Sequence, residues 1–212
     1  MIVYGSSLSP FVRKVLAFAG EKGIEVENQA AGGPNAPPEF LEASPFRKIP
    51  AFRDGDFTVA DSSAIVHYLE ALKPEPALIP TEAKARARTI WFDEFADTII
   101  GPTCAKMMFN RIVAPRFIGR DGDLEAADKA EREELPPALD YLETVIPDTL
   151  HLVGGGLTLA DIAVATMFAN FKHLNVAIDA ARYPRVTAFA AAMLGRPSFS
   201  TWVEQERTML GA

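Results

Sequence analysis

The chain has 212 residues, of which 49% are hydrophobic, and its formal net charge is −7 at pH 7. This length suits one large domain or two small ones with a substantial core. The negative charge, without any run of Lys or Arg, argues against a surface that binds nucleic acid. The single cysteine excludes an internal disulfide and a cysteine-rich metal site, and the three widely spaced histidines predict no zinc site.

Two kinds of targeting segment are not predicted. No apolar run approaches the roughly 18 residues of a membrane-spanning helix. The amino terminus also lacks the charged-then-apolar layout of a secretory signal. We therefore expect a cytoplasmic protein with no membrane partner.

The first seventy or so residues alternate strand and helix patterns. Short apolar or β-branched runs predict four strands, at residues 2–4, 25–29, 51–53 and 57–60. Helical spacing predicts helices at residues 10–22 and 62–72, with a looser one at 38–44. The turn Asp54-Gly55-Asp56 predicts a hairpin between the last two strands, so the sheet is expected to be mixed. Residues 1–73 are thus predicted to form a small α/β domain.

The α/β pattern ends at a proline-rich segment. The prolines at positions 74, 76 and 80 favour a stiff, extended connection over a helix, so the linker is placed at residues 74–80. Residues 81–212 then read as an all-helical domain. Its first helix is predicted to be capped by Thr81 and to be kinked or broken at Gly101-Pro102.

Later helices follow from capping signals and apolar spacing. A connection is expected over residues 114–123, with the next helix starting near Leu124. Thr158 and Asp161 form a capping-box pattern before a helix that is apolar nearly all round, which predicts a helix through the core of this domain. A final helix is predicted from the spacing of Val186, Phe189 and Met193.

The turn between the first strand and the first helix carries a candidate anion site. Ser9 is predicted to be the N-cap, because Pro10 suits the first helical position. The Ser9 hydroxyl and the positive end of the helix would then converge. A thiolate is a suitable anion for such a place, since hydrogen-bond donors and helix N-termini lower the pKa of a thiol.

Two more segments place polar groups at the ends of predicted elements. Pro50, at the entrance of the third strand, is expected to follow a cis bond that turns the N–H and C=O of Ile49 toward an extended peptide. Ser62 is expected to cap the next helix and to bind a carboxylate there. Asp61 beside it would supply a counter-charge for an ammonium group. Together with Ser9, these segments suit a peptide that carries a thiol and an amino acid end.

These segments make the chain resemble a bacterial-type glutathione S-transferase of the serine-containing cytosolic class over nearly its whole length. The matching runs are Ser9-Pro10-Phe11-Val12-Arg13-Lys14-Val15, Glu21-Lys22-Gly23-Ile24, Lys48-Ile49-Pro50-Ala51-Phe52, Asp61-Ser62-Ser63-Ala64-Ile65 and Leu157-Thr158-Leu159-Ala160-Asp161-Ile162-Ala163. The resemblance implies a thioredoxin-like domain that binds glutathione and an all-helical domain that shapes a pocket for the electrophile. It also implies a two-fold homodimer, with glutathione as co-substrate and no other cofactor.

The resemblance further implies a role for each matching residue. Ser9 is similar to the hydroxyl that donates to the glutathione sulfur, and Ile49, before Pro50, to the residue that pairs with the cysteinyl backbone. Asp61 and Ser62 would hold the γ-glutamyl group. Six further residues are assigned more loosely. Lys48 would bind the glycyl carboxylate. The electrophile pocket would be lined by Phe11 and by the group Met107, Met108, Phe109 and Arg111.

The implied activity is conjugation of the glutathione thiolate to small hydrophobic electrophiles, a detoxification reaction. No cysteine stands at position 9, which argues against thiol–disulfide chemistry, and Leu8 after Ser6-Ser7 departs from the pattern of isomerase-type relatives. Glutathione-dependent isomerase, dehalogenase, lyase or peroxidase activity remains an alternative. So does a non-enzymatic role in binding a ligand or a protein partner. Ser6, Ser7 and Tyr4 remain alternatives to Ser9 as the group beside the sulfur.

Overall fold

The computed structural model describes residues 1–32 and 36–211, so the last residue of the predicted helical domain lies outside it. The chain forms two compact units. The first comprises Met1–Arg86 together with Gly195–Ala212, and the second comprises Ala87–Leu194. The predicted division into domains 1–73 and 81–212 assigns residues 195–212 to the helical domain. In the structure, these residues instead group with the amino-terminal unit.

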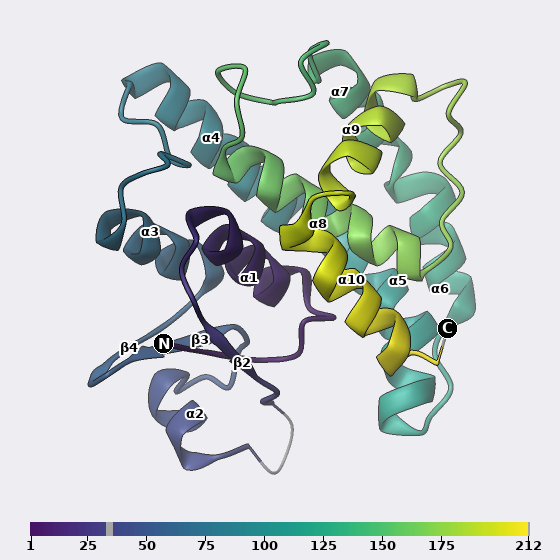
Figure 1. The fold of residues 1–212 in the computed structure, drawn as a ribbon. Coiled ribbons are helices and arrows are strands. Elements are labelled where there is room, and N and C mark those ends of the chain that lie inside the picture. The colour runs from purple at the N-terminus through teal and green to yellow at the C-terminus, as the bar shows by residue number, and fades with distance from the viewer. Residues whose placement is uncertain (33–35, 212) are drawn as a thin grey trace. The chain divides into compact units, whose positions relative to one another are not determined.

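A four-stranded sheet forms the centre of the first unit (Figure 1). Its strands are β1 (Ile2–Tyr4), β2 (Glu27–Gln29), β3 (Ala51–Asp54) and β4 (Phe57–Ala60), in the order β2-β1-β3-β4. β1 pairs with β2 in parallel, whereas β3 is antiparallel to both β1 and β4. The mixed sheet and the β3–β4 hairpin predicted from the sequence are therefore confirmed.

Helices lie on both faces of this sheet (Figure 1). α1 (Pro10–Lys22) and α3 (Ser62–Leu72) pack together on one face, and α2 (Pro38–Ala43) contacts β3 and β4 from the other. Alternation along β1 explains this division, because Val3 and Tyr4 point to opposite faces. Tyr4 is 2% exposed and packs with Phe40 of α2, so it belongs to the core of this unit.

The first unit contains one helix that was not predicted. α10 (Pro197–Met209) packs on α1, so the helix ending at Leu194 is not the last one. Its buried residues, Phe199, Val203 and Glu206, are spaced as a helical stripe. One of the three is charged, and most of the other residues of the helix are polar. The apolar face of α10 is therefore narrow, which explains why the spacing of apolar residues did not predict this helix.

The proline-rich segment 74–80 contains no helix or strand and is fastened to α1 and α3. The Lys22 ammonium donates to the Glu70 carboxylate and to the carbonyls of Pro74 and Pro76. Glu70 in turn accepts hydrogen bonds from backbone N–H groups of the segment. A buried ion pair therefore holds this connection to the first unit.

The second unit is helical. In chain order it contains most of α4 (Ala83–Phe95), then η1 (Ala96–Ile100), α5 (Gly101–Met108), η2 (Phe109–Ile118), α6 (Leu124–Lys129), η3 (Ala130–Glu134), α7 (Pro136–Val145), α8 (Leu159–His173) and α9 (Pro184–Leu194). The elements labelled η are π-helical. The predicted cap Thr81 is wrong, because the Glu82 carboxylate accepts from the N–H groups of Lys84 and Ala85 instead.

Prolines change the helix type in this unit but do not end the helices. Gly101-Pro102 follows η1 directly, Pro115 lies inside η2, and Pro136 follows η3. A proline removes one N–H donor and crowds the carbonyl of the preceding turn, and a wider π turn accommodates both. At Gly101-Pro102, where a kink or a break was predicted, the chain passes from η1 into α5 without a break. The predicted connection begins too early, since the chain stays helical to Ile118.

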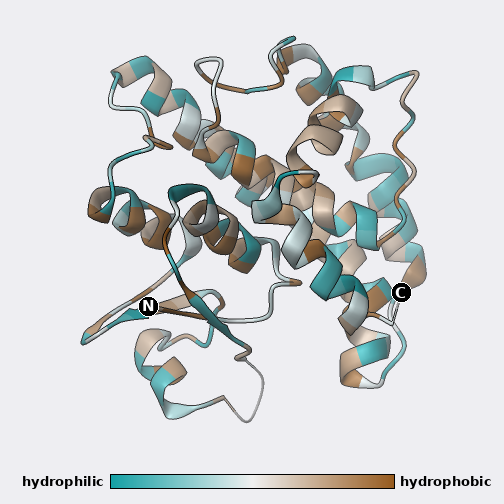
Figure 2. Ribbon diagram, in the orientation of Figure 1, coloured by the Kyte–Doolittle hydropathy of each residue, from teal (hydrophilic) through white to brown (hydrophobic). Residues whose placement is uncertain are grey.

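α8 runs through the core of the second unit as predicted, and its residues from Leu159 to Phe171 are buried. Figure 2 shows apolar residues along most of it. The capping box is present: the Asp161 carboxylate accepts from the N–H of Thr158, and also from the N–H of Leu152. Burial raises the pKa of Asp161, and these backbone donors oppose the rise. Asp161 therefore ties the preceding loop to the start of α8.

Candidate functional site

Strand register brings three predicted site segments to one edge of the sheet. Tyr4 at the end of β1 is opposite Ala51, and Ala51 is opposite Ala60 at the end of β4. The residues just beyond this row are Gly5, Pro50 and Asp61. The turn leading to Ser9, the bond between Ile49 and Pro50, and the start of α3 are therefore neighbours, although 40 residues separate Ser9 from Ile49 and 12 separate Ile49 from Asp61.

The turn between β1 and α1 packs closely against Ile49. Gly5 has φ +134°, and a Cβ placed there would lie 2.6 Å from Val12 Cγ2 and 2.9 Å from Ile49 Cβ. Only glycine fits such a position without a shift of its neighbours. Gly5 therefore allows the turn that carries Ser9 to lie against the segment that carries Ile49.

Ser9 occupies the N-cap position of α1 but does not use its side chain as a cap. Its backbone is extended (φ −71°, ψ 126°) and Pro10 follows as the first helical residue, as predicted. The backbone carbonyl of Ser9 accepts the first helical hydrogen bond, from Arg13 N–H at 3.0 Å. The hydroxyl makes no capping hydrogen bond, so the predicted capping role of the side chain is wrong. The hydroxyl is instead available to a ligand beside the helix start.

The alternatives to Ser9 are less well placed. The Ser6 hydroxyl accepts from Leu8 N–H within the turn, at 3.4 Å. Ser7 and Tyr4 are both buried. Among these hydroxyls, that of Ser9 alone combines partial exposure with a position at the N-terminus of a helix.

The segment before β3 presents Ile49 at the surface of the first unit. The Ile49–Pro50 peptide bond is cis, as predicted, and Ile49 is half-buried while Lys48 is exposed. Ser44 closes this loop, because its hydroxyl donates to the Lys48 carbonyl at 2.7 Å and accepts from the Lys48 N–H at 2.8 Å. Arg47 adopts φ +56°, a left-handed conformation that favours glycine.

Asp61, and not Ser62, is the N-cap of α3. One carboxylate oxygen of Asp61 accepts from the N–H groups of Ser63 and Ala64, at 2.9 and 3.2 Å. Ser62 is the first residue of the helix and is buried. Asp61 has φ +82°, which is rare for a residue other than glycine, and such strain concentrates at functional sites. The carboxylate is exposed and lies at the same edge as Ile49.

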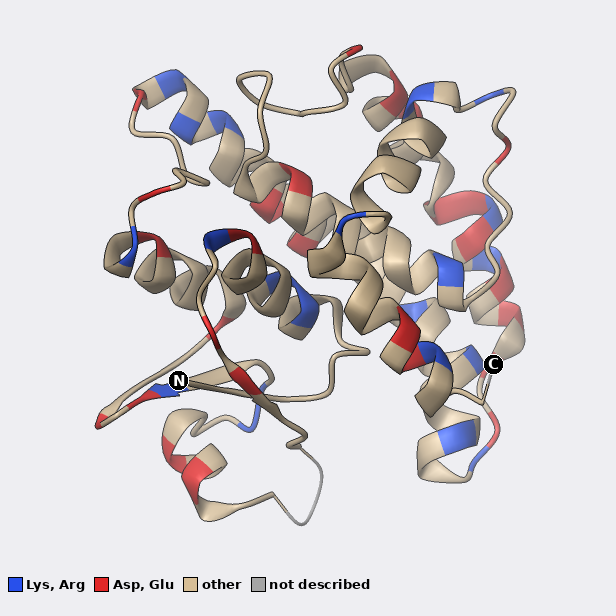
Figure 3. Cartoon of the chain, viewed as in Figure 1, with Lys and Arg blue, Asp and Glu red and all other residues tan. Residues whose placement is uncertain are grey.

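Lys14, which the sequence analysis did not single out, links the first turn of α1 to the first turn of α3. Its side chain is buried, and its ammonium donates to the Ser63 hydroxyl at 3.1 Å. Figure 3 shows basic residues on the first turns of α1. A buried cation and the positive ends of α1 and α3 together favour an anion at this edge. Lys14 lies within an apolar run, and no pattern in the sequence distinguishes it from a surface lysine.

The residues predicted to line an electrophile pocket have different surroundings. Phe11 of the first unit is half-buried. Of the second-unit residues, Met107 and Met108 are buried, whereas Phe109 is exposed. Arg111 donates to the carboxylates of Asp128 and Glu131. The Arg111 guanidinium is thus engaged by acidic groups of its own unit.

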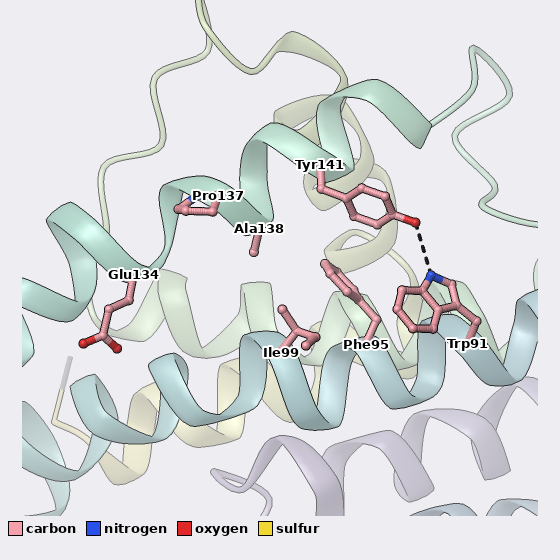
Figure 4. Close-up of a pocket in the computed structure, with 7 residues that line it drawn as sticks. All are labelled: Trp91, Phe95, Ile99, Glu134, Pro137, Ala138 and Tyr141. Atoms are coloured by element: carbon pink, nitrogen blue, oxygen red, sulfur yellow. Dashed lines mark hydrogen bonds between the residues drawn. The ribbon is translucent and has the colours of Figure 1, made fainter.

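The second unit also contains an apolar cavity of about 280 Å³ that none of these residues lines (Figure 4). Trp91, Phe95 and Ile99 contribute one wall, and residues of η3 and α7 the other. At one end of the cavity, the indole N–H of Trp91 donates to the Tyr141 hydroxyl at 3.1 Å. Trp91 and Ile99 are 50% and 51% exposed, which is unusual for large apolar side chains that lie on one helical face.

Neither a metal site nor a membrane segment emerges from the parts of the chain that the structure covers. Within residues 1–32 and 36–211, no cluster of three His, Cys, Asp or Glu side chains has a spacing suited to a metal ion. Over the same residues, no helix combines the length and apolar character needed to cross a bilayer.

Comparison with known proteins identifies the family. Residues 3–77 match the family model for the glutathione S-transferase N-terminal domain, and residues 109–206 match the model for its C-terminal domain. A glutathione S-transferase of Hyoscyamus muticus is 30% identical, with 98% of this chain and 99% of that protein aligned. Elongation factor 1-gamma of Schizosaccharomyces pombe is 33% identical over 76% of this chain and 38% of its own length.

Solved structures agree with this assignment. The crystal structure of glutathione transferase F7 from Populus trichocarpa superimposes with a TM-score of 0.84 and 27% identity, covering 96% of this chain and 97% of that one. It shares the fold predicted here, a thioredoxin-like domain with a mixed sheet followed by a helical domain. On the sequence, the fold and these matches, the chain belongs to the glutathione S-transferase family.

Proposed function

We propose that this protein is a glutathione transferase that binds glutathione as a thiolate and conjugates it to small hydrophobic electrophiles. The observation that carries the proposal is the Ser9 hydroxyl, which occupies the N-cap position of α1 without capping it. A cap would explain a serine at this position without any ligand. Because the hydroxyl is not used in this way, donation to a bound sulfur is the better explanation.

Glutathione is proposed to lie along the sheet edge described above. The N–H and C=O of Ile49, before cis-Pro50, pair with its cysteinyl backbone. At one end of the tripeptide, the Asp61 carboxylate faces the γ-glutamyl ammonium while Ser62, at the start of α3, holds the γ-glutamyl carboxylate. At the other end, the exposed Lys48 binds the glycyl carboxylate. These roles are supported by the strand register, which brings all three segments together.

The chemistry requires little beyond stabilisation of the thiolate. A free thiol titrates near pH 8.5, so a donor hydroxyl and a helix N-terminus need to lower its pKa by about one or two units for ionisation at neutral pH. The proton leaves to solvent. The thiolate then forms a bond to the electrophilic carbon, and the leaving group departs with the bonding electron pair. No enzymic general base is needed for this step.

The electrophile is proposed to contact Phe11 and residues of the helical unit. Met107, Met108, Phe109 and Arg111 are the candidates there. Met107 and Met108 are buried and Arg111 is held by two carboxylates, so Phe109 is the best placed of the four to contact a ligand. Small apolar electrophiles fit a set of this composition. We further propose a cytoplasmic, detoxifying role, with no cofactor beyond glutathione.

The test is ultraviolet titration of the wild-type protein with glutathione bound. We expect thiolate absorbance at pH 7 and an apparent thiol pKa below 7.5, about one unit under the free value. S-methylglutathione, which has no ionisable thiol, gives the baseline that removes the protein's own tyrosines and Cys104. The same preparation is expected to conjugate glutathione to an activated aryl halide. A complex without thiolate at pH 7 would refute the activation model.

A second function has one specific observation in its favour. The match to elongation factor 1-gamma spans 76% of this chain. A chain with this fold therefore need not be an enzyme. In that case the chain would use the fold to bind a ligand or a protein partner. The titration distinguishes the two, because a binding module has no need to ionise the thiol. An isomerase, dehalogenase, lyase or peroxidase would ionise it but would act on a different second substrate.

We also propose a homodimer that covers exposed apolar side chains. Phe46 of the first unit is 86% exposed, and Trp91 at the cavity of the second unit is 50% exposed. Exposed apolar side chains that border an apolar cavity, as Trp91 does, are typical of an interaction surface. Trp91→Glu is expected to convert a dimer into a monomer in size-exclusion chromatography with light scattering. Phe117→Glu is the matched control, since Phe117 is 56% exposed on another helix and should leave the dimer intact. A wild-type monomer would contradict the proposal.

A further inference from the structure

The C-terminal helix α10 is fastened to both ends of α1, the helix that begins after Ser9. Near the start of α1, the Arg13 guanidinium donates two hydrogen bonds to the Glu206 carboxylate, at 3.0 and 2.7 Å. Near its end, the Glu21 carboxylate accepts two from Arg196, at 2.7 and 2.8 Å. The residue numbers rise along α1 as they fall along α10. The two helices are therefore antiparallel neighbours within the first unit (Figure 1).

The two ion pairs differ in burial and in distance from Ser9. Both side chains of the Arg13–Glu206 pair are 0% exposed, whereas those of the Arg196–Glu21 pair reach solvent. Arg13 is one turn from Ser9, about 6 Å along the helix axis, and Glu21 is about 18 Å away. Figure 3 shows basic residues on the first turns of α1 and charged residues of both signs on α10.

A direct link runs from Glu206 to Ser9. Glu206 holds the Arg13 side chain, and the Arg13 backbone N–H donates to the Ser9 carbonyl at 3.0 Å to close the first turn of α1. A bidentate guanidinium–carboxylate contact constrains direction as well as distance. A residue from the far end of the chain therefore restrains the turn that sets the direction of the Ser9 hydroxyl.

We propose that Arg13 and Glu206 are positioning residues for Ser9, so that the lowered pKa of the bound thiol depends on α10. This inference rests on the proposed function. A hydrogen bond to a thiolate weakens steeply with misalignment. Loss of the pair should therefore affect the thiol pKa more than it affects the affinity for the tripeptide, whose other proposed contacts lie just before β3 and at the start of α3.

The test compares two charge-neutral double variants. Arg13→Met with Glu206→Met removes the buried pair near Ser9, and Arg196→Met with Glu21→Met removes the pair at the other end of the same helix interface. Each change leaves the net charge unaltered, so a shift in thiol pKa cannot arise from an added charge. Urea unfolding measures the stability of each variant. S-methylglutathione binding measures affinity without the ionisable thiol.

The first double variant is expected to raise the pKa of the bound thiol by about one unit, which lowers the thiolate fraction at pH 7 up to tenfold. Its affinity for S-methylglutathione should stay within about twofold of wild type, which corresponds to a small change in binding free energy. The second double variant should lose stability but keep the wild-type thiol pKa. Glu206→Asp, which withdraws the carboxylate by one methylene, should give an intermediate pKa.

Two results overturn the inference. One is a wild-type thiol pKa in the first double variant, and the other is an equal shift in both double variants, which would indicate general loosening of α1. If the first double variant does not fold, Glu206→Asp tests the inference in its place. A wild-type thiol pKa in Glu206→Asp would contradict the positioning role of the pair. Failure of the proposed function is distinct, because it would show as an unionised thiol in the wild-type complex itself.

Discussion

Ser9→Ala is expected to raise the pKa of bound glutathione by one to two units and to reduce turnover at pH 7 by about 10- to 100-fold. A hydrogen bond to a charged acceptor contributes about 1.5–3 kcal/mol, which corresponds to this range. The sign follows from linkage: the hydroxyl stabilises the thiolate, so its loss favours the thiol. Turnover should recover as the pH rises through the new thiol pKa, and the pH profile of kcat measures both effects.

Stability provides a second measurement for this variant. When the side chain of a serine caps a helix, its replacement by alanine lowers the stability of the protein by about 1 kcal/mol. The Ser9 hydroxyl makes no capping hydrogen bond, so the free energy of unfolding should change by less than about half of that. Ser6→Ala is the matched control in the same turn and should keep the wild-type pH profile. The opposite pattern, with Ser9→Ala less stable but its pH profile unchanged, would reduce Ser9 to a structural cap.

Asp61→Asn is expected to weaken glutathione binding by about three- to tenfold while leaving turnover at saturation unchanged. Asparagine keeps an oxygen that caps α3 and tolerates a positive φ, so the substitution removes the charge alone. The loss is limited because Asp61 is exposed, and solvent weakens its attraction for the γ-glutamyl ammonium. Titration calorimetry measures the affinity, and steady-state kinetics separate KM from kcat.

A glutathione analogue without the α-amino group completes a double-mutant cycle for Asp61. Wild type and Asp61→Asn should bind this analogue equally, because neither makes the ion pair with it. Asp61→Ala should bind glutathione as weakly as Asp61→Asn and should also lose about 1 kcal/mol of stability with the cap. If Asp61→Asn weakens the analogue as much as it weakens glutathione, Asp61 does not face the ammonium.

The elements of the first unit were largely predictable because local signals agree with the fold there. Glycine at residue 55, between β-forming runs, indicates the hairpin, and Pro10 after Ser9 indicates the start of α1. Both are decided by backbone preferences within a few residues. The same is true of Thr158 and Asp161, whose capping box was predicted and is present.

The sequence-based predictions are least accurate where the local signals are compatible with more than one backbone structure. Pro102 predicted a kink or a break, and the chain there changes from π-helix to α-helix without a break. Thr81 and Ser62 are acceptable N-caps, but Glu82 and Asp61 accept the hydrogen bonds instead. Which of two adjacent polar residues caps a helix depends on where the helix begins, and packing decides that position.

The sequence by itself determined the family, the order of strands and helices from β1 to α3, and the presence of a serine, a proline and an acidic residue at the ends of three of these elements. These features are local, and short-range backbone chemistry specifies them. Only the tertiary structure decided that register aligns Tyr4, Ala51 and Ala60 and so brings those ends together. It also decided that α10 pairs Glu206 with Arg13, since a single buried carboxylate acquires a partner only when two distant helices pack. Likewise, the sequence proposed Ser9 as the donor to the sulfur, and only the structure decided that its hydroxyl makes no capping hydrogen bond.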